Sequence, residues 1–154
     1  MLKKITQKRS NFSGGTFAIV ASKYNSRSVD AMLAAAKKEL TRAGAEILQV
    51  VRVPGAFEIP VVAAKLAGSK KFSAIICLGV ILRGATTHAQ HIGEAVSTVL
   101  AQIQAQREIP IIHEVLLLES EEQARQRCLS KEHNRGTEAA QTALEMARVM
   151  KNLD

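Results

Sequence analysis

The residue best suited to proton transfer is His88, which follows the small and basic stretch at residues 83–87. Gly84 permits close approach of a ligand to the backbone, and Thr86 or Thr87 can cap a helix that begins after them. This helix start could also form an anion cradle. The positive end of the helix dipole disfavours an imidazolium, so we expect a neutral His88 that can accept a proton. A solvated histidine beside a well-capped helix is the alternative.

Two arginines are candidates for binding a phosphate. Arg127 and Arg135 flank a turn-like segment at residues 130–134, and two guanidinium groups can hold a phosphate through forked hydrogen bonds. A solvated charged surface is the commoner outcome for such a run. The chain has no Walker motif and no GxGxxG pattern, which removes the best support for a bound nucleotide or NAD.

Two further loops carry groups that could hold a flat heterocycle. Tyr24, the only tyrosine, follows an apolar run and could either stack on a ring or pack over a sheet edge. In the segment at residues 54–60, a beginning helix presents free backbone N–H groups. Glu58 could accept ligand N–H or hydroxyl groups, or it could simply be a favourable acid in a first helical turn.

Metal binding and nucleic-acid binding find little support. His91 lies one residue short of the i,i+4 spacing of zinc-binding histidine pairs, and no cysteine or acid completes a set with His88. The formal net charge is +7, but the basic residues are scattered and aromatic residues do not interleave with them. An anionic small substrate and simple solubility both account for such a charge.

The expected compartment is a reducing cytoplasm. No apolar stretch reaches about 18 residues, and the first residues lack the apolar segment of a signal peptide, so we expect neither a membrane span nor secretion. Cys77 and Cys128 form no CxxC pair and no disulfide framework. Cys77 lies in an apolar run and is expected to be a buried thiol.

Short apolar runs alternate with helical patterns after an N-terminal arm at residues 1–15, and residues 16–154 are expected to form a single domain. This alternation predicts a parallel sheet with helices on both faces, joined by right-handed crossovers. Ligands bind such sheets beyond the carboxyl ends of the strands, so the loops after Ser22, Val53, Leu78 and Leu117 are the ones of interest. Strands are predicted at 16–22, 47–53, 73–78 and 110–117, a loop at 79–87, and helices at 29–43, 57–66, 92–103, 121–128 and 136–150. Ser26 or Ser28 could cap the first of these helices and Gly44 could end it, and Pro60 must lie in the first turn of the second.

Together these stretches resemble lumazine synthase, in family order and at family spacing, over nearly the whole chain from about Thr16. The combination of PGAFEIP at residues 54–60 with RGATTH at residues 83–88 is the most specific part. The resemblance is also carried by Tyr24-Asn25, by residues 78–82, by Glu122-Gln123-Ala124, by Arg127 and by Asn134-Arg135-Gly136.

The resemblance implies a flavodoxin-like three-layer α/β/α fold with a four-stranded parallel sheet. It implies condensation of 5-amino-6-(D-ribitylamino)uracil with 3,4-dihydroxy-2-butanone 4-phosphate to 6,7-dimethyl-8-ribityllumazine, phosphate and water, with no cofactor, in riboflavin biosynthesis. Sites of the family lie between neighbouring subunits of a pentamer, and some members assemble pentamers into icosahedral shells. Riboflavin synthase is then a candidate partner.

The resemblance also assigns roles by position. His88 would transfer protons, with Glu138 orienting it, and Arg127 would supply positive charge for the phosphate. Tyr24 would be the platform for the pyrimidine ring. The full set of implied substrate contacts is Tyr24, Asn25, Ala56, Phe57, Glu58, Val80, Ile81, Leu82, Gly84, Ala85, Thr86, His113, Arg127 and Arg135.

The chain departs from the family pattern in its last third. His113 stands where phenylalanine is usual, on the neighbouring subunit's side of the site, and Arg135 stands where lysine is usual. Leu117-Leu118 replaces a pair of threonines, and Glu132-His133 replaces Ala-Gly. These changes keep open a catalytically weak relative that binds a flavin or ribityl-pyrimidine or serves as a shell scaffold. A generic flavodoxin-like binding module is a further alternative, which leaves the joint presence of His88 and Arg127 unexplained. Only the net charge supports a nucleic-acid binder.

Overall fold

Four apolar segments form one parallel sheet, in the order β2-β1-β3-β4, in the computed structural model, which describes residues 12–154. Most of the predicted arm at residues 1–15 therefore lies outside the described residues. The expected parallel sheet is confirmed. Its strands are β1 (Thr16–Ser22), β2 (Glu46–Val53), β3 (Ala74–Leu82) and β4 (Ile111–Leu118).

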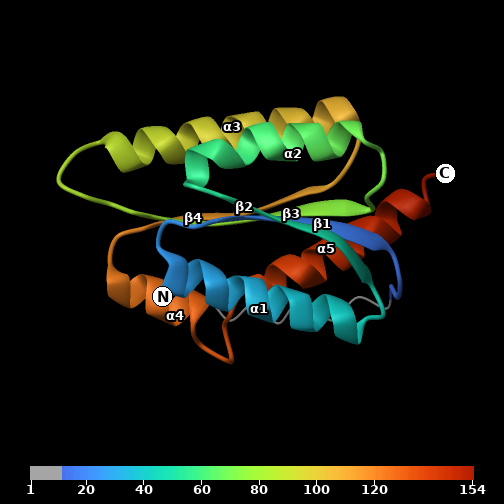
Figure 1. Ribbon diagram of the computed structural model, residues 1–154, viewed down its shortest axis with the longest axis horizontal. Coiled ribbons are helices and arrows are strands. Elements are labelled where there is room, and N and C mark those ends of the chain that lie inside the picture. The colour runs from blue at the N-terminus through green and yellow to red at the C-terminus, as the bar shows by residue number, and fades with distance from the viewer. Residues whose placement is uncertain (1–11) are drawn as a thin grey trace.

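Helices cover both faces of this sheet, as Figure 1 shows, which confirms the three-layer α/β/α, flavodoxin-like architecture. One face carries α1 (Ser26–Arg42), α4 (Glu121–Cys128) and α5 (Arg135–Lys151). The other carries α2 (Ile59–Gly68), which follows a short 3₁₀ turn at Ala56–Glu58, and α3 (His88–Arg107). None of these helices has the length and apolar character that crossing a bilayer requires.

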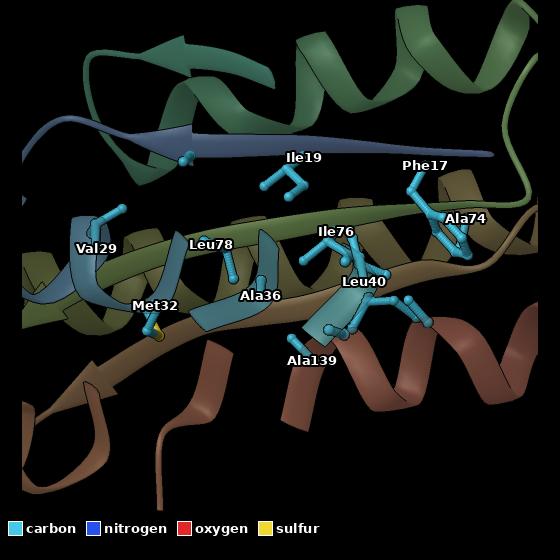
Figure 2. Packing of buried hydrophobic residues seen from close by; sticks show 14 of the residues in the cluster. Phe17, Ile19, Val29, Met32, Ala36, Leu40, Ala74, Ile76, Leu78 and Ala139 are labelled. Carbon is cyan, nitrogen blue, oxygen red and sulfur yellow. The ribbon is translucent and has the colours of Figure 1, made fainter. Parts of the chain in front are cut away.

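The strands bury side chains on both faces, which is why they are nearly continuous apolar runs. Phe17 and Ile19 of β1 pack under α1 and α5, whereas Ala18 and Val20 point toward α2 and α3. Figure 2 shows the first of these two layers, with Met32 of α1 among the labelled side chains. The predicted core thiol of Cys77 is fully buried, and burial raises its pKa to about 12.

The third strand is longer than predicted. It continues to Leu82, so the loop expected at residues 79–87 shrinks to residues 83–87. Gly79, which suggests a turn, instead pairs with Val115 of β4. A Cβ on Gly79 would lie 3.2 Å from a methyl carbon of Ile59 and 3.3 Å from the Ser22 hydroxyl, so this glycine serves tight packing in the sheet.

Some predicted helix ends are confirmed and others are wrong. Gly44, with a φ of 70°, follows the last turn of α1, and its N–H donates a hydrogen bond to the carbonyl of Thr41, as is typical of a glycine that ends a helix. Pro60 lies in the first turn of α2, as that helix requires. The α1 cap is Asn25 rather than a serine, and Thr87 sits at the α3 cap position without a side-chain capping bond.

Candidate functional site

Three of the predicted loops are tied together at the carboxyl edge of the sheet. The N–H of Lys23 donates to the carbonyl of Val53 at 2.7 Å, and that of Tyr24 donates to the carbonyl of Pro54 at 3.0 Å. The Asn25 side-chain amide donates to the carbonyl of Val80 at 2.7 Å. Asn25 has the left-handed backbone conformation, with a φ of 58°, which asparagine tolerates better than most residues. The loop that carries Tyr24 is thus bonded to both neighbouring strands.

Two aromatic rings stand exposed on these tied loops. Tyr24 is 75% exposed and Phe57 is 63% exposed. Large exposed rings mark a surface that contacts a ligand or another protein. Glu58 is exposed beside Phe57 at the start of α2, whereas Ala56 is buried and offers only its backbone. This arrangement can hold a flat ring and its polar edge.

His88 is the first residue of α3, and its side chain is exposed. Its imidazole makes no hydrogen bond within residues 12–154, and its backbone N–H lies 3.4 Å from Oγ1 of Thr86. The preceding loop is exposed throughout and extends beyond the sheet edge in Figure 1. Its base is held by an ion pair of 2.9 Å between Arg83 and Glu119. His88 is therefore accessible at a helix N-terminus, with Gly84, Ala85 and Thr86 open beside it.

The predicted lining residues at the end of β3 divide between the two faces of the sheet. Val80 and Leu82 face the α1 side and Ile81 faces the α3 side. A hollow of about 550 Å³ lies on the α1 and α4 side of this edge. Tyr24, Phe57 and His88 do not line it. The hollow is lined by Asn25, Ser26, Arg27, Ser28, Val80, Leu82, Glu121, Glu122, Arg125 and Leu129.

A second group of charged residues gathers where β4, α4 and α5 meet. Nε of Arg135 donates to Oε2 of Glu114 at 3.2 Å. Nη1 of the same guanidinium lies 3.0 Å from Oε2 of Glu138, although the two groups are not aligned for a hydrogen bond. Arg127 has no hydrogen bond or ion pair in the described part of the chain. Of the two arginines, Arg127 is therefore the one whose charge is available to an anion.

The electrostatics of this group centre on Glu114, which is buried. Burial raises the pKa of its carboxyl to about 7, against the opposing effect of Arg135 and, more weakly, of Arg127. The Glu138 carboxylate adds to the upward shift. The thiol of Cys128, next to Arg127 in α4, also has its pKa raised by burial, to about 11.

His113 lies on the opposite face of β4 from Glu114, because successive strand residues alternate. Its Nδ1 accepts the N–H of Val115 at 3.3 Å, and its Nε2 lies 2.8 Å from the hydroxyl of Ser97 in α3. Partial desolvation lowers the pKa of the imidazole, a shift that a backbone hydrogen bond opposes. A neutral ring with Nδ1 as acceptor carries its proton on Nε2 and donates it to Ser97.

Within one chain the structure does not bring all predicted site residues together. The aromatic loops and His88, at the start of α3, form one group. Arg127 of α4 forms another with Arg135 and Glu138 of α5, and these two helices lie on the opposite face of the sheet from α3 (Figure 1). Glu138 contacts Arg135 rather than His88. No cluster of three metal-ligating side chains occurs in residues 12–154.

Sequence reasoning missed Glu114. Its signal is an acid at an inward position of an apolar strand, between Ile112 and Leu116 on the same face. Such a residue needs a partner, because charged side chains are almost never fully buried unless paired.

Comparison with known proteins gives one consistent result. Residues 14–151 match the sequence profile of the family described as 6,7-dimethyl-8-ribityllumazine synthase. A protein of that name from Syntrophus aciditrophicus (strain SB) is 41% identical over 151 residues, which are 97% of this chain and 98% of that protein. Another from Clostridium kluyveri (strain ATCC 8527) is 37% identical over 153 residues, which are 98% and 99% of the two chains.

Proposed function

The chain belongs to the 6,7-dimethyl-8-ribityllumazine synthase family, and from this premise we propose how its residues perform the family's reaction. It is a transferase-type condensing enzyme of riboflavin biosynthesis. Its substrates are 5-amino-6-(D-ribitylamino)uracil and 3,4-dihydroxy-2-butanone 4-phosphate, which join to form the lumazine with loss of phosphate and water. The observation that carries our assignment is the coupling of exposed Tyr24, through its bond to Pro54, to the loop that carries Phe57.

The pyrimidine binds at this pair of loops. Tyr24 stacks on the ring and Phe57 packs against its edge, since both rings are exposed on loops that backbone hydrogen bonds join. The backbone at Ala56 and the carboxylate of Glu58 bind the polar ring edge and ribityl hydroxyls. Asn25 supports the Tyr24 loop. The end of β3, from Val80 to Leu82, borders the site through its backbone and through the side chain of Ile81, which faces the α3 side.

The phosphate-bearing substrate binds at the loop before α3. The backbone at Gly84, Ala85 and Thr86 provides N–H donors near a helix N-terminus, where anions are favoured. Arg127 supplies positive charge that stabilises departing phosphate, because no carboxylate in residues 12–154 lies within ion-pair distance of it. Arg135, from the same group, contacts the other substrate, because the carboxylates of Glu114 and Glu138 offset its charge.

His88 transfers protons. Formation of the imine between amine and ketone requires proton transfers near neutral pH, for which an accessible imidazole is suited. Holding both substrates in contact contributes a further part of the rate enhancement. No cofactor or metal enters this scheme.

The complete site forms between two subunits. His88 and Arg127 belong to groups that lie on different sides of one sheet, so a neighbouring copy supplies the second group. Apolar side chains exposed on α2 and α3, Val61 at 71% and Val99 at 38%, fit a contact with another copy on that face. We therefore assign a homo-oligomer, pentamer or higher, with residues 16–154 as the lumazine-synthase-like domain. Riboflavin synthase is the candidate partner, and the buried unpaired cysteines suit a reducing cytoplasm.

A second candidate is a catalytically weak relative that binds a flavin or ribityl-pyrimidine, or acts as a shell scaffold. The bond between His113 and Ser97 favours it, because a histidine held by α3 stacks on a ligand less freely than the usual phenylalanine.

The test is absorbance-monitored formation of the lumazine from both substrates by purified oligomer. Formation at an enzymic rate is expected. A folded oligomer without turnover would favour the second candidate, as a binding protein if it binds the pyrimidine and as a shell scaffold if it binds neither substrate.

A further inference from the structure

Glu114 is a buried acid that neither the family resemblance nor the proposed reaction uses. It is 7% exposed, and it lies among apolar residues on the α5 side of β4. Taking a carboxylate out of water is costly unless it is paired and hydrogen-bonded. Its partner, Arg135, is a residue of the candidate site, so the pair connects the protein core with that site.

The two ends of this contact are held firmly. Glu114 is on a central stretch of β4, which pairs with β3 along its length. Arg135 begins α5, where Asn134 caps the helix by accepting the N–H of Gly136 at 2.7 Å and donates to the carbonyl of Cys128 at 2.7 Å. Gly136 itself packs on the backbone of Met32. The contact between Glu114 and Arg135 is thus set by the fold, not by two free side chains.

The geometry also explains why an arginine is present. Nε of Arg135 meets Glu114 at 3.2 Å, while Nη1 lies 3.0 Å from Glu138. A planar guanidinium reaches two carboxylates at once with fixed geometry, whereas the single nitrogen of a lysine does not reproduce that fork. Nη2 of Arg135 makes no hydrogen bond within residues 12–154, which leaves it as a donor for a ligand.

Charge decides which ligand group this donor suits. Two carboxylates face one guanidinium, so the cluster of Glu114, Arg135 and Glu138 offers no excess positive charge to a phosphate dianion. Arg127 carries that excess. A neutral oxygen acceptor, such as a carbonyl of the pyrimidinedione or a ribityl hydroxyl, suits the Nη2 donor better.

We propose that Glu114 is a positioning residue for the pyrimidine substrate, which holds Arg135 by its Nε so that Nη2 is presented to a neutral oxygen of that substrate. This inference rests on the proposed function. Without Glu114, Arg135 keeps only Glu138, one turn along its own helix, and the guanidinium can rotate away. The phosphate-bearing substrate, held elsewhere, is unaffected.

The experiment measures KM for each substrate and the Kd of the pyrimidine by calorimetry. It compares the unsubstituted oligomer with Glu114→Gln, Glu114→Ala, Arg135→Lys and the double variant Glu114→Ala with Arg135→Lys. Glu114→Ala removes the charged hydrogen bond that holds Arg135. It should therefore raise the pyrimidine KM and Kd about tenfold. Glu114→Gln keeps an acceptor and should raise them less. KM for the phosphate substrate should stay within about twofold, and Glu114→Ala should add little in the Arg135→Lys background.

The matched control is Glu145→Ala, which removes another acid that pairs with an arginine of α5, Arg148, away from the site. It should leave both KM values unchanged. Size-exclusion chromatography and circular dichroism check assembly and folding, and Glu114→Gln serves if Glu114→Ala does not fold.

Unchanged pyrimidine KM and Kd in both Glu114 variants would overturn the positioning role while leaving the proposed function intact. So would an equal loss for both substrates. Turnover failing with pyrimidine binding retained would contradict the proposed reaction alone, because the Kd series still tests Glu114. Loss of all pyrimidine binding in the unsubstituted protein would overturn both.

Discussion

The side-chain amide of Asn25 donates a 2.7 Å hydrogen bond to the carbonyl oxygen of Val80. This bond joins the loop after β1 to the end of β3, next to the exposed ring of Tyr24. Asn25 also adopts the left-handed conformation that turns the chain into α1. Its side chain and its backbone thus serve one purpose, which is to fix the direction in which Tyr24 leaves the sheet.

Substituting Asn25 separates these two contributions. Asn25→Gly loses the hydrogen bond but also removes the Cβ that the left-handed region disfavours, and should lower the free energy of unfolding by about 1 kcal/mol. Asn25→Ala loses the same bond and keeps a Cβ in this region without the tolerance of asparagine, and should cost about 1 kcal/mol more. Both should raise the pyrimidine KM, as steady-state kinetics and urea unfolding at one protein concentration can check. Equal unfolding curves for the two variants would show that the backbone conformation is not strained.

His88→Ala should lower kcat and leave the fold intact. The imidazole is exposed and makes no hydrogen bond in the described residues, so its removal takes no packing with it. Acid–base groups contribute about 100-fold or more to rate. We expect kcat to fall about 100-fold, while the part of the rate that comes from substrate proximity is preserved. Single-turnover absorbance measurements test this, with His91→Ala as the control on the same helix. An unchanged single-turnover rate would exclude His88 as the proton-transfer residue.

Arg127→Ala should weaken use of the phosphate substrate alone. Arg127 has no ion-pair partner in residues 12–154, so its loss leaves no buried carboxylate unpaired. Hydrogen bonds to charged groups contribute about 1.5–3 kcal/mol, which corresponds to a KM increase of about 10- to 100-fold. Arg125→Ala is the control, because Arg125 lies on the same helix and pairs with Glu122. An equal loss of pyrimidine affinity would argue against this role.

Much of the fold could be predicted because buried parallel strands and amphipathic helices leave simple patterns. The prediction failed at single residues whose role depends on distant parts of the chain. Gly79 suggested a turn, but its pairing with Val115 depends on a strand more than thirty residues away. Serines near α1 suggested a cap, yet Asn25 turns the chain through a left-handed conformation and uses its amide on Val80 instead.

The candidate site was harder to predict than the fold. Family motifs identified His88 and Arg127, but no local pattern shows that the sheet separates them within one chain. Glu114 was missed because its significance depends on Arg135, which lies twenty-one residues away. The pairing of Glu138 with Arg135 is likewise a tertiary fact, and it changes which residue that acid can orient.

Gly136→Ala should be the most damaging small substitution near the site. An added Cβ would lie 2.1 Å from the carbonyl oxygen of Met32, so α5 would have to move away from α1. Overpacking usually costs about 1–3 kcal/mol, and a backbone atom cannot yield as a side chain does, so we expect about 3 kcal/mol or more. Gly68→Ala, where nothing lies within 4 Å, should cause no loss of stability. Thermal unfolding of the two variants at equal concentration distinguishes them, and similar melting temperatures would contradict the close packing of α5 on α1.

The stability of the protein should depend on pH through Glu114. The pKa of this carboxyl is about 7 in the folded protein against a usual value of 4.5, and the groups that face it are Arg135 and Glu138 of α5 with Arg127 and Cys128 of α4. The folded state therefore binds more protons than the unfolded state between these values. Stability that is present below pH 4.5 is lost as pH rises through 7, by about 3 kcal/mol.

Glu114→Gln removes this titration. The variant should therefore gain stability relative to the unsubstituted protein by about that amount between pH 5 and pH 8, as urea unfolding at fixed protein concentration can measure. The kinetics should move in the opposite direction. Because the ionised carboxylate holds Arg135 more strongly, the pyrimidine KM of the unsubstituted protein should fall from pH 6 to pH 8, and that of Glu114→Gln should not show this fall. A stability difference that stays constant over this range would mean that Glu114 keeps one charge state throughout, and its contact with Arg135 would then be independent of pH.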